Sequence, residues 1–271
     1  MIPFTKMHGL GNDFVVIDRR GGEIKLAPER IRALADRRRG IGFDQLILID
    51  PPANGAAGIA LRFHNADGGE VGACGNGTRC AAALVMAETG SDALQIETVA
   101  GPLHAETRSD GLVAVDMGRA RLRWSDIPLA SKVDTMALPI TLGPLSNPSA
   151  VSMGNPHCIF FVPDAEDIDL EALGPQLEHH EMFPERTNVE VATVTGDDVI
   201  RLRVWERGAG ITLACGTGAC ATAVAAHRLG LTGRTVALDM DGGRLSVEWR
   251  ENGRVIMTGP VATSFTGEIA P

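Results

Sequence analysis

The sequence predicts an α+β fold of two pseudo-symmetric domains, each a curved or barrel-like β-sheet wrapped around a central buried helix. Two observations lead to this prediction. Ala-Cys-Gly-Asn-Gly at residues 73–77 recurs as Ala-Cys-Gly-Thr-Gly at residues 214–218, an offset of 141 residues. Each copy is followed by a segment that is apolar almost all round a helix, which is typical of a helix buried on every side. A buried helix in a strand-rich half requires a sheet that curls around it.

The repeat extends beyond these motifs and indicates where the halves meet. Equivalent residues recur at offsets of 141 or 143, namely Arg62 and Arg203, Gly101 and Gly242, Gly118 and Gly259, Asn12 and Asn155, and Gln45 and Asn188. We therefore place an N-terminal half at residues 1–118 and a C-terminal half at 119–263. The tail, residues 264–271, is expected to pack on the N-terminal half. Residues 119–148 contain several prolines and no clear period, which is typical of a linker with entry strands.

Short apolar or alternating runs predict strands in the same order in both halves. They cover residues 14–17, 46–49 and 59–64 in the first half, and 158–162, 189–194 and 199–205 in the second. The central helices are expected at Thr78 to Glu88 and at Ala219 to Leu229, each after a Cys-Gly-x-Gly turn.

Composition narrows the classes of function. The formal net charge is −9 and the basic residues are scattered, which argues against nucleic acid as a partner. No apolar run reaches the ~18 residues of a membrane span, and the start lacks the apolar core of a signal peptide, so we expect a cytoplasmic protein without membrane contact. The three lysines, Lys6, Lys25 and Lys132, lie outside Gly-rich motifs, which disfavours a Schiff-base cofactor such as pyridoxal phosphate.

The five cysteines have two different interpretations. Their odd number, without a secretion signal, indicates free thiols rather than a disulfide framework. Cys80 and Cys220 lie inside the predicted helices and Cys158 lies in an apolar strand, so all three are expected in the core. A zinc site is disfavoured because no histidine pair accompanies Cys215 and Cys220.

Cys74 and Cys215 each precede a glycine-rich turn at a helix N-terminus. The positive end of the helix dipole favours thiolate, so we expect a lowered pKa for both thiols. The N–H groups of the turn form a site suited to a carboxylate. One such cysteine is more often a core residue, but two at equivalent positions indicate chemistry. With one sulfur on each face of a carbon, the pair would supply the acid and the base that stereoinversion needs.

The whole chain resembles the diaminopimelate epimerase family. The resemblance rests on the motifs at residues 7–14, 42–45, 63–68, 73–80, 154–157, 187–189, 206–210 and 213–220. It implies two domains with a central helix in each, and interconversion of LL- and meso-diaminopimelate on the bacterial route to lysine and cell wall. It also implies a reaction without pyridoxal phosphate, any other cofactor or a metal, and a homodimer.

The resemblance assigns roles by matching position. Cys74 and Cys215 correspond to the acid and base. The residues expected to bind the substrate are Asn12, Gln45, Asn65, Gly75, Asn76, Asn155, Asn188, Glu206, Arg207, Gly216 and Thr217. Within this set the two motif turns form the cradle for the reacting carboxylate, and Arg207 meets the distal carboxylate. His157 and Glu206 are expected to tune the two sulfurs. Many relatives have an acidic residue where this chain has Ile211, and no role is carried to that position.

Three other functions compete with this one. A proline or hydroxyproline racemase of the same fold would lack the cluster of amide side chains and the Glu206-Arg207 pair. A phenazine-pathway isomerase would have replaced the cysteines. A redox-sensing or metal-binding module would show zinc binding or disulfide cycling without turnover. The cluster of amides fits a long substrate with two amino-acid ends better than a small ring.

Overall fold

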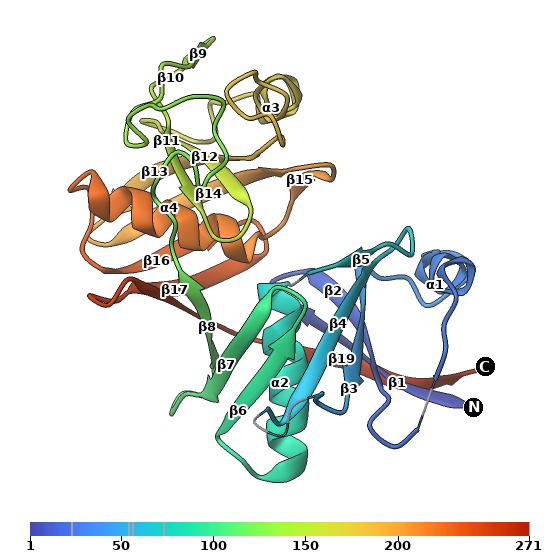
Figure 1. Ribbon diagram of the computed structural model, residues 1–271. Helices are drawn as coiled ribbons and strands as arrows, with labels where there is room; N and C mark the ends of the chain where they lie inside the picture. Colours follow the sequence, from blue (N-terminus) through green and yellow to red (C-terminus); the bar gives the residue numbers. More distant parts are fainter. Residues whose placement is uncertain (23, 54, 56, 73, 271) are drawn as a thin grey trace. The chain divides into compact units, whose positions relative to one another are not determined.

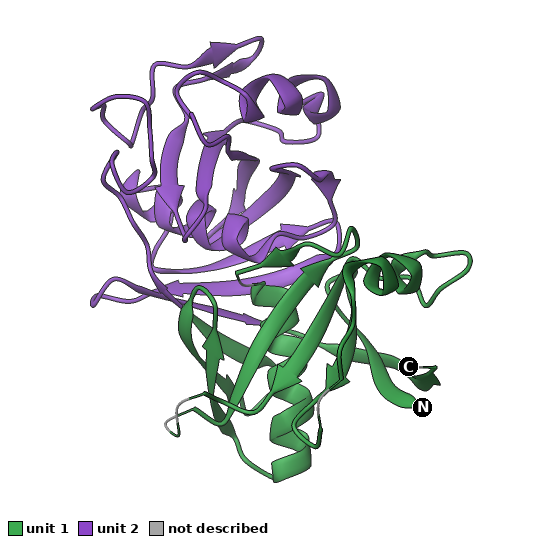
Figure 2. Cartoon of the chain, turned by 45° about the vertical axis from the view of Figure 1, so that its right-hand side comes forward, with its two compact units in different colours: residues 1–116, 259–271 green, residues 117–258 purple. Residues whose placement is uncertain are grey.

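The computed structural model describes residues 1–22, 24–53, 55, 57–72 and 74–270. The chain divides into two compact units, residues 1–116 with 259–271 (unit 1) and residues 117–258 (unit 2), which Figure 2 colours separately. Each unit has a β-sheet, a long central helix and a shorter helix (Figure 1). Within the described residues, no helix is both long and apolar enough to cross a membrane.

Unit 1 contains the elements β1 (Ile2–Gly9), β2 (Asn12–Asp18), α1 (Pro28–Ala35), β3 (Gln45–Asp50), β4 (Ile59–Asn65), β5 (Glu70–Val71), α2 (Gly75–Thr89), β6 (Ala93–Thr98), β7 (Gly101–Thr107), β8 (Val113–Arg119) and β19 (Ala262–Ile269). Unit 2 contains β9 (Thr141–Leu142), β10 (Leu145–Ser146), β11 (Ser149–Ser152), β12 (Pro156–Phe161), α3 (Leu170–Glu178), β13 (Asn188–Gly196), β14 (Val199–Glu206), β15 (Gly210–Thr212), α4 (Gly216–Arg228), β16 (Thr235–Met240), β17 (Gly243–Trp249) and β18 (Arg254–Gly259). Every strand predicted from the sequence lies within or overlaps one of these strands.

The two units pair their strands in one pattern. In unit 1, β2 and β3 are parallel, β4 is antiparallel to β3 and parallel to β6, and β6, β7 and β8 form an antiparallel meander. In unit 2, β12 and β13 are parallel, β14 is antiparallel to β13 and parallel to β16, and β16, β17 and β18 form the equivalent meander. The predicted pseudo-symmetric repeat is confirmed. The last strand, β19, pairs with β1 in unit 1 and begins at Ala262, whereas the sequence placed the change of half after residue 263.

Each central helix is enclosed by the sheet of its own unit. Helix α2 contacts β1, β2, β3, β6 and β7, and α4 contacts β11, β12, β13, β16 and β17. A helix that touches both early and late strands of its sheet requires that sheet to curl around it, as predicted. Small residues make the close approach possible. A Cβ added to Gly77 would lie 2.9 Å from Ile47 Cδ1 and 3.1 Å from Phe63 Cε1.

The shorter helices α1 and α3 pack against the outer faces of the sheets. In unit 1, Val15, Ile17, Leu46 and Leu48 pack against Ile31 and Leu34 of α1. In unit 2, the equivalent cluster includes Phe160, Val189 and Leu177 of α3. Strands that bury both faces read as continuous apolar runs, which explains the sequence pattern of β2, β3 and β12.

Two sequence predictions need correction. Residues 119–148 are more than a linker with entry strands, because Ile127, Leu138 and Ile140 are buried in the core of unit 2. The central helices begin three residues earlier than predicted, at Gly75 and Gly216, because each cysteine caps its helix directly. The Gly-x-Gly segment is therefore the first helical turn itself, where free N–H groups are presented.

Candidate active site

Cys74 and Cys215 occupy the same structural position in the two units. Each is the N-cap of its central helix with extended backbone, at φ −144° and ψ 115° for Cys74 and φ −120° and ψ 112° for Cys215. Each sulfur accepts a hydrogen bond from the backbone N–H three residues later, from Gly77 and Gly218 respectively, both at 3.4 Å. Sulfur therefore takes the place that a serine or aspartate oxygen usually holds at a helix start. The cap fixes each sulfur beside the positive end of the helix.

The N-terminal half-site is Cys74 with the polar residues that surround the start of α2. The Cys74 thiol donates to Asn12 Oδ1 over 3.9 Å, and Asn12 Nδ2 donates to Asp44 Oδ2 at 2.8 Å. Asp13 and Asp44 are joined by reciprocal bonds, each backbone N–H donating to the other carboxylate at 3.0 Å. Arg37 bridges the two carboxylates at 2.8 and 2.7 Å. This network holds Asn12 against the sulfur.

Gln45 and Asn65 lie at the same edge of unit 1 as Asn12. Asn12 and Gln45 begin the parallel strands β2 and β3, and Asn65 ends the antiparallel strand β4, directly opposite Gln45. Gln45 Nε2 donates to Asn65 Oδ1 at 2.9 Å. The carbonyl oxygen of the Gln45 amide is buried and has no hydrogen-bond partner among the described residues. An unsatisfied buried acceptor of this kind is available to a donor such as an ammonium.

The C-terminal half-site is Cys215 with a chain of hydrogen bonds behind it. Cys215 Sγ lies 3.6 Å from Thr217 Oγ1, and Asn155 Nδ2 donates to the same hydroxyl at 3.3 Å. Asn155 Oδ1 is 3.1 Å from His157 Nε2, and His157 Nδ1 is 2.6 Å from Glu190 Oε1. His157 and Glu190 are completely buried. The structure thus brings Asn155, His157 and Thr217 together with Cys215.

Arg207 and Asn188 lie on one side of this half-site. Asn188 Nδ2 donates to the Pro156 carbonyl and Asn188 Oδ1 accepts the Arg207 N–H, both at 2.9 Å. Asn188 therefore ties the Arg207 turn to the segment that carries Asn155. Arg207 lines a cavity of about 540 Å³ together with Arg121, Ser152 and Gly154. A guanidinium at such a polar cavity is suited to bidentate binding of a carboxylate.

Glu206 precedes Arg207 and acts on Cys215. Its carboxylate accepts a hydrogen bond from Thr212 Oγ1 at 2.6 Å. The neighbouring Ile211 is 44% exposed, so the apolar residue at this position faces away from the core. The sequence had singled out Glu206 for tuning a sulfur, and its negative charge is one of the influences on the Cys215 thiol.

The pKa of Cys215 differs from the sequence prediction. Burial raises the pKa of the Cys215 thiol well above its usual range, and the charges of Glu206 and Glu190 act in the same direction. Hydrogen bonds from Thr217 and from the Gly218 N–H lower it, but they do not outweigh burial. The prediction of a lowered pKa considered the helix end alone and omitted the desolvation of the sulfur. Cys215 is therefore protonated near neutral pH.

The other three cysteines are core residues. Cys80, Cys158 and Cys220 have no exposed surface. Burial raises the pKa of Cys80 to about 12 and raises that of Cys158 well above its usual range. Both thiols stay protonated and unreactive at neutral pH.

Alkylation should distinguish these thiols, because iodoacetamide reacts with the thiolate form. At about pH 7 we expect Cys74 to be labelled first, since it is half-buried whereas the other cysteines are buried. Labelling of Cys215 should rise as the pH rises toward its raised pKa, with Cys80 and Cys158 remaining unlabelled. Peptide mass mapping over a pH series measures this order. Faster labelling of Cys215 than of Cys74 near neutral pH would contradict it.

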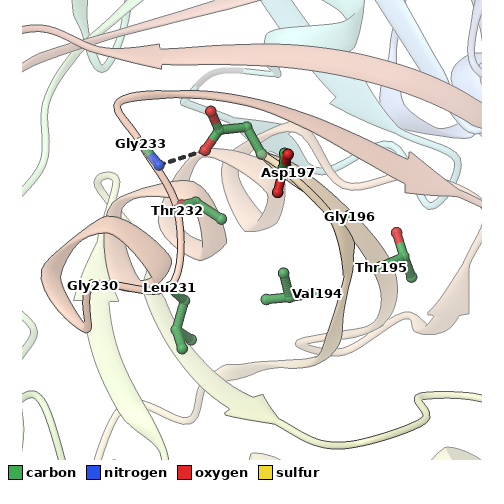
Figure 3. Close-up of a pocket in the computed structure, with 9 residues that line it drawn as sticks. Val194, Thr195, Gly196, Asp197, Gly230, Leu231, Thr232 and Gly233 are labelled. Carbon is green, nitrogen blue, oxygen red and sulfur yellow. Dashed lines mark hydrogen bonds between the residues drawn. The ribbon is translucent and has the colours of Figure 1, made fainter.

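A second cavity of unit 2 lies apart from Cys215. It measures about 660 Å³ and is lined by the turn between β13 and β14 and by the segment after α4, including Asp197, Asp198 and Thr232 (Figure 3). The Asp198 carboxylate accepts the Gly233 N–H. This cavity lies at the C-terminal end of α4, a helix of 13 residues, so it is ~20 Å from Cys215 at 1.5 Å per residue.

Sequence reasoning missed two acidic residues of the half-sites. Asp44 fixes Asn12, and Glu190 bonds His157. Asp44 is itself part of the Gly-Phe-Asp-Gln motif at residues 42–45, so it could have been predicted together with its neighbour Gln45. Glu190 sits in an alternating strand and gives no such signal, because its burial depends on what covers β13.

The sequence of this chain is similar to known proteins over nearly its whole length. The sequence model of the diaminopimelate epimerase family matches residues 4–123 and 149–264. Proteins named diaminopimelate epimerase from Rhodospirillum centenum and Acidiphilium cryptum are 56% and 55% identical over 267 residues, which is 98% of this chain and 92% and 96% of theirs.

Solved structures show the same fold at low sequence identity. A probable proline racemase from Agrobacterium radiobacter superposes with a TM-score of 0.70 at 15% identity, covering all of this chain and 93% of the other. A phenazine biosynthesis protein from Bacillus anthracis gives a TM-score of 0.69 at 14% identity over 100% and 99% of the two chains. Identities this low bear on the fold alone.

Proposed function

Because the chain belongs to the diaminopimelate epimerase family, we propose that it interconverts LL- and meso-diaminopimelate, a step in the bacterial synthesis of lysine and peptidoglycan precursors. The observation that carries the proposal is the repeated cysteine N-cap. Each unit presents one sulfur and one set of helix N–H groups in the same local geometry. An isomerase that inverts one carbon needs a proton acceptor and a proton donor of this matched kind.

The proposed reaction is a two-base proton transfer at the α-carbon. One sulfur, as thiolate, takes the α-proton and becomes a thiol. The other, as thiol, gives its proton to the opposite face of the same carbon and becomes a thiolate. In the reverse direction the two exchange roles. The raised pKa of Cys215 supports its acting as the acid in one direction, because a protonated sulfur is then already in place.

The helix N-termini hold the reacting carboxylate in this proposal. Backbone N–H groups of Gly75, Asn76, Gly216 and Thr217 would stabilise the negative charge that spreads onto that carboxylate when the α-proton leaves. The first turns of α2 and α4 present these groups at the two cysteine caps. The glycines leave no side chain between the backbone and the ligand.

The remaining polar residues would recognise the rest of the substrate. Arg207 binds the distal carboxylate, and Glu206 lies near an ammonium group. Five amide side chains bind or position the amino-acid ends of the molecule, namely those of Asn12, Gln45, Asn65, Asn155 and Asn188. His157 joins the hydrogen-bond chain that ends at Cys215.

The proposal includes the setting of the reaction. The enzyme uses its own side chains and needs no cofactor. We place it in the cytoplasm, where thiols stay reduced, and expect a homodimer by its resemblance to the family.

The test is direct conversion of pure LL-diaminopimelate, followed by chiral chromatography. We expect meso-diaminopimelate to appear until the isomers reach equilibrium, without added cofactor. The double variant Cys74→Ala with Cys215→Ala is the blank. If proline or hydroxyproline were inverted and diaminopimelate were not, the proposal would be wrong.

Oxidation should abolish this activity reversibly. If both sulfurs reach one carbon, they also reach each other, so exposure to air should give a Cys74–Cys215 disulfide. Activity should fall in air and return with a thiol reductant. Mass mapping of the oxidised protein checks the lesion, and oxidation at Cys80 or Cys220 with Cys74 and Cys215 still free would count against the proposed pair.

A further inference from the structure

Glu190 is a buried carboxyl group that the proposed mechanism does not use. It lies in β13 with no exposed surface, and its Oε1 atom is bonded to His157. Its second oxygen, Oε2, is buried without a hydrogen-bond partner among the described residues. A carboxyl group in this position is costly to bury, so a retained one calls for a role.

The hydrogen bonds around His157 define its protons. Asn155 Nδ2 donates to Thr217, so Asn155 turns its Oδ1 toward His157. Because Oδ1 only accepts, His157 Nε2 must carry a proton and donate it. A second proton is held in the 2.6 Å bond between His157 Nδ1 and Glu190 Oε1. The ring is thus fixed at both nitrogens, with its Nε2–H directed along the chain toward Cys215.

Glu190 also lies close to the cap of α4. A Cβ added to Gly218 would be 2.7 Å from Glu190 Oε1 and 3.3 Å from Cys215 Sγ, so the carboxyl group and the sulfur border the same glycine. The titratable groups facing Glu190 are His157 on β12, Glu206 on β14 and the thiols of Cys158 and Cys215. His157 is the one of these that bonds to it through a side chain.

We propose that Glu190 is a positioning residue of the epimerase, which holds the imidazole of His157 in one orientation with its proton at Nε2. The hydrogen bonds that run from His157 through Asn155 and Thr217 to Cys215 then keep one direction of donation. The proposal deepens the proposed function and rests on it. Burial raises the pKa of Glu190 while His157 acts against the rise, which agrees with one proton shared between the two groups. The arrangement resembles the use of an acidic residue to set the tautomer of a catalytic histidine.

The variant that tests this is Glu190→Gln, which keeps the size of the side chain and removes its charge. We expect kcat to fall ~10- to 100-fold, as is typical for loss of a residue that orients another, with KM changed less than about twofold. Glutamine can no longer hold the ring through a charge at Nδ1, so the pH–rate profile of the variant should differ from that of the wild type.

The matched control is Val191→Ala, on the same strand. Val191 is buried on the opposite face of β13, in the cluster with Phe160 and Leu177. It should lower thermal stability and leave the pH profile in place. If Val191→Ala and Glu190→Gln reduced kcat equally with no shift of the pH profile, Glu190 would be a packing residue and the proposal would be overturned.

Nitrogen-15 NMR of the histidines gives a readout that does not depend on turnover. The chain has seven histidines, and the signal of His157 is identified by its loss in His157→Gln. In the wild type, His157 should carry its proton at Nε2, where it faces Asn155 Oδ1. In Glu190→Gln the ring should lose this single arrangement and show both tautomers.

A wild-type ring without a proton at Nε2 near neutral pH would refute the proposal even if the variant failed to fold. The same single tautomer in a folded Glu190→Gln variant would refute it as well. If the wild type did not epimerise diaminopimelate while the NMR results held, the proposed function would fail and the link between Glu190 and His157 would stand.

Discussion

Replacing either Cys74 or Cys215 with alanine is expected to reduce inversion of diaminopimelate to less than ~1% of the wild-type rate, because a positioned acid or base contributes 10²–10⁴-fold. Serine should be nearly as damaging, since an alcohol is far too weak an acid to exchange protons near neutral pH. Initial rates of meso-diaminopimelate formation measure both effects. Either alanine variant retaining more than this rate would rule out the two-sulfur mechanism.

The single variants should still carry out half of the reaction. The surviving sulfur can remove and return the α-proton on its own face, so the substrate should exchange its α-hydrogen with solvent without inversion. Exchange should favour one stereoisomer in Cys74→Ala and the opposite one in Cys215→Ala. Cys158→Ala is the control, because Cys158 is buried in the outer core of unit 2. It should cost stability and leave inversion within about twofold, as expected for a cavity away from the site.

Replacing Arg207 with glutamine is expected to lower kcat/KM for diaminopimelate by ~10²-fold, since an unsatisfied charge-assisted pair costs a few kcal/mol. Lysine offers both amino groups and lacks the distal carboxylate. The wild-type enzyme should therefore discriminate against lysine by a similar factor, and Arg207→Gln should lose most of that discrimination. Steady-state kinetics of the wild type and of Arg207→Gln with diaminopimelate and with lysine give the four kcat/KM values that measure this discrimination.

Arg234→Gln supplies the control for loss of one positive charge. Arg234 lies over the Trp249 ring on the surface of unit 2, away from Arg207. Its replacement should leave both substrates unaffected. If the wild type epimerised lysine as efficiently as diaminopimelate, Arg207 would not be the residue that binds the distal carboxylate.

The fold was predictable because the same sequence pattern occurs in both halves of the chain. The motifs around Cys74 and Cys215 gave the repeat, and the apolar runs of β2, β3, β12 and β13 gave strands buried on both faces. The 119–148 segment was misjudged because Ile127, Leu138 and Ile140 are spaced without a period, although each is buried. Irregular segments bury residues by tertiary contact, which leaves no periodic pattern to detect.

Half-site residues that lie in sequence motifs were predictable. Properties that depend on tertiary packing were less predictable. Cys215 shows this limit. Its place at a helix start could be predicted, whereas its raised pKa results from complete burial and from Glu206 and Glu190, which the fold brings near. The contact between Glu190 and His157 could not be predicted from the sequence, because it depends on the parallel pairing of β12 and β13.

The origin of the new α-hydrogen tests the two-sulfur mechanism most directly. The wild-type enzyme is mixed with LL-diaminopimelate in heavy water, and the first meso product is analysed by mass spectrometry and proton NMR. The incoming hydrogen comes from a thiol that has equilibrated with solvent, so the meso product should carry deuterium at the inverted carbon from the first turnover. Meso product that retains the substrate's own hydrogen at that carbon would show that a single group carries the proton across, and would contradict the mechanism.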